Sequence, residues 1–431
     1  MTSIEKIYEL FLASGSISTD SRRIEKGSLF FALKGENFNG NKFAEDSVQK
    51  GASYAIIDEK QYQTSARTIL VDNVLQCLQD LALFHRRKLG IPILGITGTN
   101  GKTTTKELIA AVLSKKYKVT YTQGNLNNHI GVPLTLLCMN KDTEFGVVEM
   151  GANHPGEIET LCKIADPDFG IITNIGKAHL EGFGSFEGII KTKGELYKYL
   201  KHKQGTVFYN HDNPILEEIG KSLPHRISYG KRDADFNGEP AQSPPYIHVK
   251  ATFPKGVLYL NSKLIGAYNF ENILAAACIG NHFGIDPIKI QEAIKEYTPS
   301  NNRSQLIQKG DLKIIMDAYN ANPTSMRASI NSFSETKNVT PYLILGDMLE
   351  LGEYSKEEHQ SILELLKEKN FQNVFLVGKE FSDANQNFNF LAFKNVGELC
   401  QFLETNPIKN GTLLIKGSRG IQLEKVLQYL S

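Results

Sequence analysis

Residues 91–106, Ile-Pro-Ile-Leu-Gly-Ile-Thr-Gly-Thr-Asn-Gly-Lys-Thr-Thr-Thr-Lys, constrain the fold more than any other stretch of the chain. The apolar residues between Ile91 and Ile96 predict a short buried strand, a glycine-containing turn follows, and a helix with an apolar face is expected from Lys102 onward. Backbone N–H groups in such a loop converge on one point, and the helix N-terminus adds partial positive charge. The stretch therefore predicts a site for a nucleoside triphosphate, with Lys102 supplying a full positive charge and Thr103 a hydroxyl ligand for Mg²⁺.

This loop departs from the common phosphate-loop pattern, which requires a glycine five residues before Gly101. Ile96 stands at that position, and the glycine lies at Gly98 instead, which gives Gly-Thr-Asn-Gly-Lys-Thr. The alternative is a surface turn followed by an ordinary helix cap. Because glycine, lysine and threonine coincide at a strand-to-helix junction, the sequence favours phosphate binding.

Composition and charge argue against several classes of partner. The chain has 431 residues, and its 48 basic and 47 acidic residues nearly cancel, so bulk charge gives no support to a nucleic-acid partner. No apolar run approaches the ~20 residues of a membrane span, and the first residues lack the layout of a signal peptide. We therefore expect a soluble cytoplasmic protein without a membrane partner. Its five cysteines stand singly and are interpreted as reduced thiols, and no sustained heptad requires more than a monomer.

The order of apolar runs predicts an α/β protein of three domains, 1–88, 89–299 and 300–431. The first is expected to be a small α/β unit with a helical opening, short strands and a polar, glycine-rich turn over 34–42. In the second, alternating strands and helices predict a mostly parallel, doubly wound sheet covered on both faces, with a hairpin over 246–260. The pattern then restarts, which predicts a third domain with its own sheet.

Two side chains are expected to share a crevice with the loop. The strand over 145–150 carries Glu149 near its end, and His179 follows the apolar run over 169–175. In open α/β sheets, ligands lie beyond the carboxyl ends of the strands. Taken singly, Glu149 fits a solvated strand end and His179 fits a structural histidine, but their shared position relative to the loop favours a functional role.

Other candidates carry weaker signals. Lys193 lies on a lysine-rich helix, and its spacing alone favours a solvated face. Asn269 and Asn272 lie three residues apart near the start of another helix, where they either cap the helix or read a nucleotide base. Ser21 and Arg22, together with the polar turn, offer donors that suit a phosphorylated ligand.

Eight short motifs lie in the second and third of the expected domains. They are Gly98–Thr103, Val148–Ala152, Asn174–Gly182, Lys191–Glu195, Asn269–Asn272, Asp317–Pro323, Leu345–Gly352 and Lys416–Arg419. In this order they resemble the motifs of the Mur ligases. The resemblance implies a small N-terminal α/β substrate domain, a central domain similar to phosphate-loop ATPases and a C-terminal Rossmann-like αβ domain.

The resemblance also implies an activity. Glu-Met-Gly-Ala, Gly-Asp-Met-Leu-Glu-Leu-Gly and Lys-Gly-Ser-Arg are most similar to the family member that adds D-alanyl-D-alanine to UDP-N-acetylmuramoyl-tripeptide, a precursor of peptidoglycan. In the family, ATP phosphorylates the precursor carboxylate to an acyl phosphate, the amine attacks and phosphate leaves. Because phosphoryl transfer depends on positioning and charge neutralisation, such a site is expected to be rich in cations and metal ligands.

Roles in binding ATP and two Mg²⁺ ions follow from the resemblance. Lys102 and the loop hold the phosphates, Thr103 and Glu149 serve the first Mg²⁺, and His179 serves the second together with Lys193, whose amine is expected to carry a carbamate. The other residues assigned to the loop are Gly98, Thr99, Asn100, Gly101 and Thr104, and those assigned to the rest of the nucleotide site are Asn269, Asn272, Arg303, Asp317 and Asn320. Arg303 matches an arginine near the γ-phosphate, and Asp317 matches a ribose contact.

The remaining matches concern the two other substrates. The uridine diphosphate end is expected at Ser21, Arg22, Asn39 and Gly40, the rest of the precursor at Asn125, Asn127 and Asn128, and the dipeptide at Ser418 and Arg419. Many relatives carry Asp and His in the turn where this chain has Asn39 and Asn41. Because ligands come from two domains, we expect the third domain to close over the first two and exclude water from the acyl phosphate.

Two competing functions remain at this stage. One is a sister ligase of the same superfamily, which would use another amino acid or make polyglutamyl folate. The other is a nucleotide-binding switch, which leaves Glu149, His179 and Lys193 without a role. ATP turnover that needs both an acyl acceptor and an amine donor would exclude the switch. Whether the third peptide residue is lysine or diaminopimelate stays open.

Overall fold

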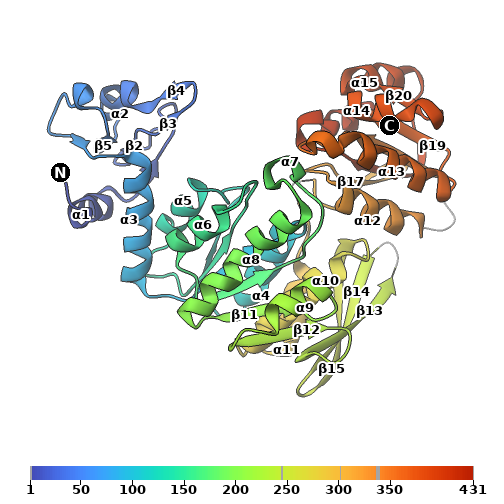
Figure 1. Cartoon of the computed structure of the whole chain (residues 1–431), viewed down its shortest axis with the longest axis horizontal. Helices are drawn as coiled ribbons and strands as arrows, with labels where there is room; N and C mark the ends of the chain where they lie inside the picture. The colour runs from blue at the N-terminus through green and yellow to red at the C-terminus, as the bar shows by residue number, and fades with distance from the viewer. Residues whose placement is uncertain (1, 244–245, 301, 336–339, 431) are drawn as a thin grey trace.

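Three sheets organise the chain in this computed structural model, which describes residues 2–243, 246–300, 302–335 and 340–430. The N-terminal unit, blue in Figure 1, and the C-terminal unit, orange to red, lie on opposite sides of a larger central unit. The three-domain α/β architecture expected from the sequence is confirmed. No helix among the described residues is long and apolar enough to cross a membrane.

The N-terminal unit has a four-stranded parallel sheet in the order β1-β2-β5-β6. Its elements are α1 (Ile4–Ser14), β1 (Ile17–Ser18), β2 (Leu29–Phe31), β3 (Lys34–Gly35), β4 (Phe38–Asn39), η1 (Gly40–Phe43), α2 (Ala44–Gln49), β5 (Tyr54–Ile57), η2 (Lys60–Tyr62) and β6 (Thr68–Leu70). Ser3 caps α1 by accepting from the N–H of Lys6, and Gly15 ends it in a left-handed conformation. The expected polar turn contains the small β3–β4 hairpin and a 3₁₀ turn.

Helix α3 (Val74–Leu89) joins this unit to the central one. It packs against α5 (Gly131–Leu137) and α6 (Glu157–Ala165) of the central unit, as Figure 1 also shows. An Arg86 guanidinium nitrogen lies 2.6 Å from an Asp168 carboxylate oxygen, and the His85 Nε2 lies 2.8 Å from the backbone oxygen of Met139. The helix is therefore fixed to the central unit just before the strand that leads into the phosphate loop.

The central sheet has nine strands in the order β15-β14-β13-β12-β11-β10-β7-β9-β8. Its strands are β7 (Ile93–Thr97), β8 (Val119–Tyr121), β9 (Phe145–Glu149), β10 (Phe169–Ile172), β11 (Thr206–Asn210), β12 (Arg226–Gly230), β13 (Phe236–Ser243), β14 (Tyr246–Phe253) and β15 (Gly256–Ile265). Pairing is parallel from β8 to β13, and β14 and β15 extend the sheet as an antiparallel hairpin. The sequence predicts this hairpin but not β13, because Gly238 and Pro240 disfavour strands.

Helices cover both faces of the central sheet, as expected. Besides α5 and α6 they are α4 (Lys102–Leu113), α7 (Leu180–Phe183), α8 (Phe186–Lys203), α9 (Pro214–Gly220), α10 (Asn269–His282) and α11 (Pro287–Glu296). Val147 of β9 belongs to the core that includes α4 and α10, whereas its neighbour Val148 belongs to the core that includes α5, α6 and α8. Side chains alternate along a strand, so this division is what a sheet buried on both faces requires.

The strand order reverses at β7, which lies between β10 and β9. Ligand sites of open α/β sheets lie at such a switch point, beyond the carboxyl ends of the strands. The loop after β7 leads directly into α4, and Glu149 ends β9. The fold therefore brings the loop and this carboxylate to the same edge.

The C-terminal unit has a six-stranded sheet in the order β16-β17-β21-β18-β19-β20, parallel except for β16. Its strands are β16 (Gln305–Lys309), β17 (Asp311–Asp317), β18 (Pro341–Gly346), β19 (Asn373–Val377), β20 (Leu391–Phe393) and β21 (Asn410–Lys416), and its helices are α12 (Pro323–Ser334), α13 (Ser355–Glu368), α14 (Lys379–Ala384) and α15 (Val396–Thr405), with four short 3₁₀ turns between 352 and 429. The sequence predicts the four inner strands, but not the edge strands β16 and β20. Edge strands bury only part of their residues and give a weaker apolar signal.

Candidate active site

Two glycines allow the loop between β7 and α4 to adopt its path. Both have positive φ, 142° at Gly98 and 74° at Gly101. A Cβ atom at Gly98 would overlap the hydroxyl of Thr173, and one at Gly101 would come within 2.6 Å of Asn272 Oδ1. The glycine that the common pattern places elsewhere is thus required at Gly98 by its neighbours in this fold.

Asn174, which follows β10, holds the front of the loop. Its backbone oxygen accepts from the N–H of Thr99 at 2.9 Å, and its side-chain oxygen accepts from the N–H of Asn100 at 2.9 Å. These two N–H groups are therefore engaged within the protein. The N–H groups at the start of a helix have no partners within it, so the first turn of α4 offers the donors suited to an anion.

Lys102 folds back over the loop. Its ammonium lies 2.8 Å from the backbone oxygen of Gly98 and 3.1 Å from that of Thr99. Burial lowers the pKa of Lys102, and the charge of Glu149 opposes this effect. The ammonium pairs here with neutral carbonyl oxygens, which leaves its charge uncompensated at short range.

Glu149 is 2% exposed, accepts hydrogen bonds from two side chains and lies close to the charge of a third. The Thr103 hydroxyl donates to Oε2 at 2.9 Å, the Asn127 amide donates to Oε1 at 2.9 Å, and the Lys106 ammonium lies 3.6 Å from Oε2. Lys106 is itself buried, and its ammonium has no hydrogen-bond partner among the described residues. Burial lowers the pKa of Lys106.

A hydroxyl beside a carboxylate suits Mg²⁺, which takes oxygen ligands and is usually held by one or two carboxylates together with substrate phosphates and waters. Thr103 and Glu149 provide this pair. Within the described part of the chain, no group of three or more His, Cys, Asp or Glu side chains is arranged to hold a metal by itself. The donor set therefore fits a metal whose remaining ligands come from phosphate and water.

A cavity of about 940 Å³ joins the central and C-terminal units in front of the loop. The predicted site residues that line it are Thr99, Asn100, Gly101, Lys102, Thr103, Thr104, Asn125, Asn127, Asn128, Glu149, His179, Asn269, Asn272, Arg303, Asp317 and Asn320. Those that do not line it are Gly98, Lys193, Ser418, Arg419, Ser21, Arg22, Asn39 and Gly40. The expectation that Glu149 and His179 face one crevice agrees with this lining.

Lys193 lies on α8 just behind the cavity wall. It is 3% exposed, and its ammonium donates to the backbone oxygen of Ala152, a lining residue, at 3.3 Å. Burial and the nearby charge of Lys102 lower the pKa of Lys193 to about 7. The solvated face that lysine spacing predicts is therefore wrong at this residue, although Lys191 is exposed.

His179 forms a contact between two units. It precedes α7 with a positive φ of 50°, and its Nδ1 pairs with the carboxylate of Glu350 in the C-terminal unit. This contact lowers the pKa of Glu350. Glu350 lies within the motif Leu345–Gly352, but nothing in the sequence indicates that its side chain contacts His179.

The two asparagines of α10 tie this helix to the phosphate-loop helix. Asn272 donates to Asn269 Oδ1 at 2.8 Å and accepts from the Thr105 hydroxyl at 3.0 Å, while Asn269 donates to the backbone oxygen of Ile265 at 2.8 Å. Neither side chain caps α10. Both lie in the wall of the cavity, so the capping alternative is wrong and the base-reading one stays a prediction.

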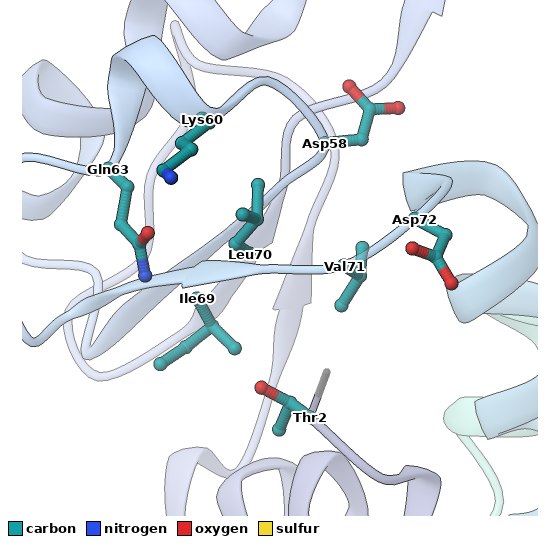
Figure 2. A pocket seen from close by; sticks show the side chains of 8 residues that line it. All are labelled: Thr2, Asp58, Lys60, Gln63, Ile69, Leu70, Val71 and Asp72. Carbon is teal, nitrogen blue, oxygen red and sulfur yellow. The ribbon is translucent and has the colours of Figure 1, made fainter.

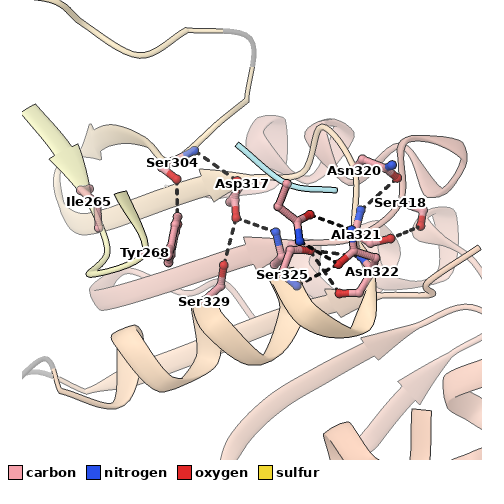
Figure 3. Close-up of polar contacts among 12 residues, drawn as sticks. Ile265, Tyr268, Ser304, Asp317, Asn320, Ala321, Asn322, Ser325, Ser329 and Ser418 are labelled. Atoms are coloured by element: carbon pink, nitrogen blue, oxygen red, sulfur yellow. Dashed lines mark hydrogen bonds and ion pairs between the residues drawn. The ribbon is translucent and has the colours of Figure 1, made fainter. Parts of the chain in front are cut away.

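On the C-terminal side, Asp317 is the centre of a polar cluster (Figure 3). Its carboxylate accepts from the Ser329 hydroxyl at 3.0 Å and from the N–H of Ser304 at 3.3 Å. It also accepts from the Lys416 ammonium at 2.6 Å. Nearby, the amide of Asn322 donates to Asn100 Oδ1 at 2.7 Å. The phosphate loop and the C-terminal unit are therefore in direct contact.

Tyr319, which the sequence does not single out, stacks with two arginines. The guanidinium of Arg303 lies 3.6 Å from the ring centroid, and that of Arg419 lies 5.6 Å from it. The Arg303 Nε is buried without a partner among the described residues. Ser418 is 3% exposed, and its hydroxyl accepts from the N–H of Leu349 at 2.9 Å.

The N-terminal candidates lie apart from this cavity. The exposed Arg22 pairs with Asp20 and lowers the pKa of that carboxyl to about 2. Asn39 accepts from the N–H of Asn41 at 3.0 Å and donates to Glu59 at 2.9 Å. A second cavity, of about 600 Å³, opens beside β6 (Figure 2). It is lined by Thr2, Asp58, Lys60, Gln63, Ile69, Leu70, Val71 and Asp72, and none of the predicted residues is among them.

Comparison with known proteins gives matches along the whole chain. The model of the Mur ligase family, catalytic domain, matches residues 15–86, that of the Mur ligase middle domain matches 96–280, and that of the Mur ligase, glutamate ligase domain, matches 302–419. The UDP-N-acetylmuramoyl-tripeptide--D-alanyl-D-alanine ligase of Bacillus subtilis is 35% identical over 98% of this chain and 94% of its own length. The ligase of that name from Escherichia coli is 32% identical over 96% and 93%.

Solved structures agree with these matches. A crystal structure of MurF from Acinetobacter baumannii has a TM-score of 0.88 at 31% identity and covers 98% of this chain and 97% of its own. That of the MurF ligase from Thermotoga maritima in complex with ADP has a TM-score of 0.85 at 29% identity, with 97% of each chain covered. By full-length similarity at this level of identity, the chain belongs to the Mur ligase family.

Proposed function

We propose that this protein is an ATP-dependent amide ligase that adds D-alanyl-D-alanine to UDP-N-acetylmuramoyl-tripeptide in cytoplasmic peptidoglycan precursor synthesis. One observation carries the proposal. The cavity sets Lys102, Thr103 and Glu149 of the central unit opposite Arg303 and Asp317 of the C-terminal unit, in a chain similar along its length to ligases of this name. A nucleotide-binding switch does not require that cations and carboxylates from two domains line one cavity at the phosphate loop.

The reaction requires two displacements. An oxygen of the precursor carboxylate attacks the γ-phosphorus of ATP, so that an acyl phosphate forms and ADP leaves. The dipeptide amine then attacks the acyl carbon, phosphate leaves, and the nitrogen loses a proton. Charge neutralisation dominates such steps, and Lys102, the first turn of α4 and Arg303 supply it here.

Mg²⁺, when bound, adds to the neutralisation of the phosphate charge. Thr103 and Glu149 would hold the first ion, since their hydroxyl and carboxylate lie 2.9 Å apart and line the cavity. His179 would take part in holding a second ion, with a carbamate on Lys193. His179 pairs with the carboxylate of Glu350, which would then act as its orienting partner.

The burial of Lys193 supports its proposed carbamylation. Because its pKa is lowered to about 7, a far larger share of this amine is neutral at neutral pH than for an ordinary lysine, and only the neutral amine reacts with CO₂. The neutral nitrogen forms a bond to the carbon of CO₂ and loses a proton, which gives an anion. Starting from the ammonium, two protons are released in all, so that a cation is replaced by an anion. We expect ¹³C-bicarbonate to give a carbamate NMR signal that Lys193→Ala removes. Wild-type activity in Lys193→Ala would contradict the proposal.

The family resemblance suggests how the remaining ligands lie, and among the residues it assigns, those numbered 125–128, 269–272 and 317–320 line the cavity. Asn269 and Asn272 would lie near the adenine, and Asp317 and Asn320 near the ribose. The precursor would extend along Asn125, Asn127 and Asn128 toward Ser21, Arg22, Asn39 and Gly40 of the N-terminal unit, with the dipeptide carboxylate at Ser418 and Arg419. Further closure of the C-terminal unit would complete the site and exclude water. A scattering radius unchanged by saturating nucleotide and precursor would contradict closure.

The decisive test is ADP production from ATP and Mg²⁺ with UDP-N-acetylmuramoyl-tripeptide, with and without D-alanyl-D-alanine. We expect turnover only with all three substrates, and a product heavier than the tripeptide precursor by one dipeptide less one water. Turnover only with another amine would move the protein to a sister ligase. Turnover without either co-substrate would contradict the ligase assignment itself.

A further inference from the structure

Asn127 lies at the point where the loop of residues 124–128 reaches the carboxylate of Glu149. Its amide nitrogen is 2.9 Å from Glu149 Oε1, and it is the only donor to that oxygen among the described residues. The other carboxylate oxygen is shared by Thr103 and Lys106. Asn127 therefore holds Oε1 of the carboxylate, and residues of α4 hold Oε2.

The backbone fixes Asn127 independently of its side chain. The N–H of Gly151, two residues beyond Glu149, donates to the backbone oxygen of Asn127 at 2.8 Å. A Cβ atom at Gly151 would lie 2.9 Å from Asn127 Cγ, so only glycine leaves room for this side chain. The backbone of Asn127 is thus held against the segment that follows β9, which places its side chain within reach of Glu149.

The other two asparagines of the loop of residues 124–128 make different contacts. Asn128 accepts from the N–H groups of Ile130 and Gly131 at 3.1 and 2.9 Å, and so holds the turn that leads into α5. Asn125 is exposed and lines the cavity. Only Asn127 among the three contacts a carboxylate, although the sequence groups them together.

We propose that Asn127 is a positioning residue that orients the Glu149 carboxylate for the metal, and that it couples the loop of residues 124–128 to metal binding. The inference rests on the proposed function, which gives Glu149 to the metal and this loop to the precursor. A carboxylate that ligates a metal is oriented by the hydrogen bond that its other oxygen accepts. Because Thr103 hydrogen bonds to Oε2 and would itself become a ligand, Asn127 is the donor free to hold the carboxylate in place.

Coupling follows from the same geometry. A ligand that orders the loop also orders the Asn127 amide, and with it the Glu149 carboxylate. By linkage, the precursor then tightens metal binding by the same factor by which the metal tightens precursor binding. In this respect the loop acts on the metal as well as on the substrate.

The test measures Mn²⁺ affinity of the full-length protein with saturating ADP, by electron paramagnetic resonance of the free ion. Asn127→Ala removes the amide, and Asn127→Leu removes it while nearly keeping the side-chain volume. Both are expected to weaken Mn²⁺ binding by about 10-fold to 100-fold. Asn125→Ala, the matched control in the same loop, is expected to leave Mn²⁺ affinity within about twofold and to raise the KM for the precursor.

The outcomes separate this inference from the function on which it rests. If both Asn127 variants fold and bind Mn²⁺ as the wild type does, while Glu149→Gln weakens binding, the inference fails and the proposed metal ligand stands. If Glu149→Gln also leaves the affinity unchanged, the proposed role of Glu149 fails. Wild-type protein gives a check that needs no variant, since addition of the precursor must raise Mn²⁺ affinity. An unchanged affinity would overturn the coupling.

Discussion

The phosphate loop and the polar turn of the N-terminal unit are both glycine-containing segments that follow a buried strand, yet they differ in how the fold uses them. The loop is in contact with β10, α10 and the C-terminal unit through Asn174, Asn272 and Asn322. The turn is held by Asn41, which contacts Asn39 and Asp58 within the same unit. The conformation of the loop therefore depends on contacts with distant elements, whereas that of the turn depends on contacts within its own unit.

This difference explains why one segment predicts a site and the other predicts only candidates. In the loop, neighbouring atoms leave no room for a side chain at either glycine, and the N–H groups of the first turn of α4 face one cavity. In the N-terminal unit, the side chains of Asn39 and Arg22, which the sequence offers as donors, are already paired, and neither of them lines the cavity in front of the loop or the one beside β6. A ligand in the N-terminal unit would have to compete with these internal partners.

The largest expected effect is on turnover, from Lys102→Ala. The proposed mechanism uses the Lys102 charge to neutralise the transferred phosphoryl group, so its removal is expected to lower kcat/KM by about 10²-fold to 10³-fold. Stability to urea should change little, because the ammonium contacts only neutral carbonyl oxygens. Arg22→Ala is the counterpart in the N-terminal unit, and it should act on the KM for the precursor alone. Equal losses of kcat in the two variants would contradict the expected difference between the loop and the N-terminal unit.

Next in size is the effect of a single methyl group on folding. Gly98→Ala places a Cβ atom into the Thr173 hydroxyl at a positive φ, and should cost about 2–4 kcal/mol of unfolding free energy. Gly35→Ala is the matched control in the polar turn, where nothing lies within 4 Å of the added atom and φ is not positive. It should change stability by less than about 0.5 kcal/mol. Urea denaturation of both variants measures the difference.

The turn has its own sensitive residue, Asn41. It is fully buried, donates to Asp58 and Asn39, and accepts from the N–H groups of Asp58 and Glu59. Asn41→Ala leaves these groups unpaired and should cost about 1–3 kcal/mol by chemical denaturation. Asn39→Ala, at a half-buried position, should cost less. If the order of the two is reversed, Asn39 and not Asn41 holds the turn.

The smallest expected effect concerns pH and the helix that joins the two regions. His85 on α3 is buried, and burial lowers its pKa below 6.5 in the folded protein. Below pH 6.5 the unfolded chain therefore binds a proton that the folded chain does not, and stability is lost as pH falls from 6.5 through the folded pKa. His85→Gln should flatten the decline of Tm between pH 7.5 and 5.5 by a few degrees. A slope identical to that of the wild type would show that His85 does not titrate in this window.

Much of the fold could be predicted because the apolar runs that form inner strands are short, continuous and separated by helices. β9, β19 and the start of α4 agree with the sequence within a residue or so. β13 could not be predicted, since its pairing with β12 and β14 overrides the disfavoured Gly238 and Pro240. Pairing with the neighbouring strands decides such a strand, and the residue preferences within the strand do not record it.

The candidate site shows the same limit. Lys102 and Glu149 were within reach of sequence reasoning because a motif and a strand end place them. The burial of Lys193 depends on how helices pack, because its spacing alone indicates a solvated lysine. The position of Lys106 behind Glu149, which the sequence does not single out, also depends on this packing. Contacts between units, such as Asn100 with Asn322, depend on residues more than 200 positions apart.

The position of β7 within the central sheet also sets an order for the assembly of the protein as it is made. β7 is the first strand of its sheet to be synthesised, and its two neighbours, β9 and β10, follow some 50 and 75 residues later. Until β10 has emerged, Asn174 is absent and the loop has nothing to hold the N–H groups of Thr99 and Asn100. A nascent chain shorter than about 175 residues therefore contains the complete nucleotide motif but cannot fold its loop. ATP can be used only after β9 and β10 have paired with the two sides of β7.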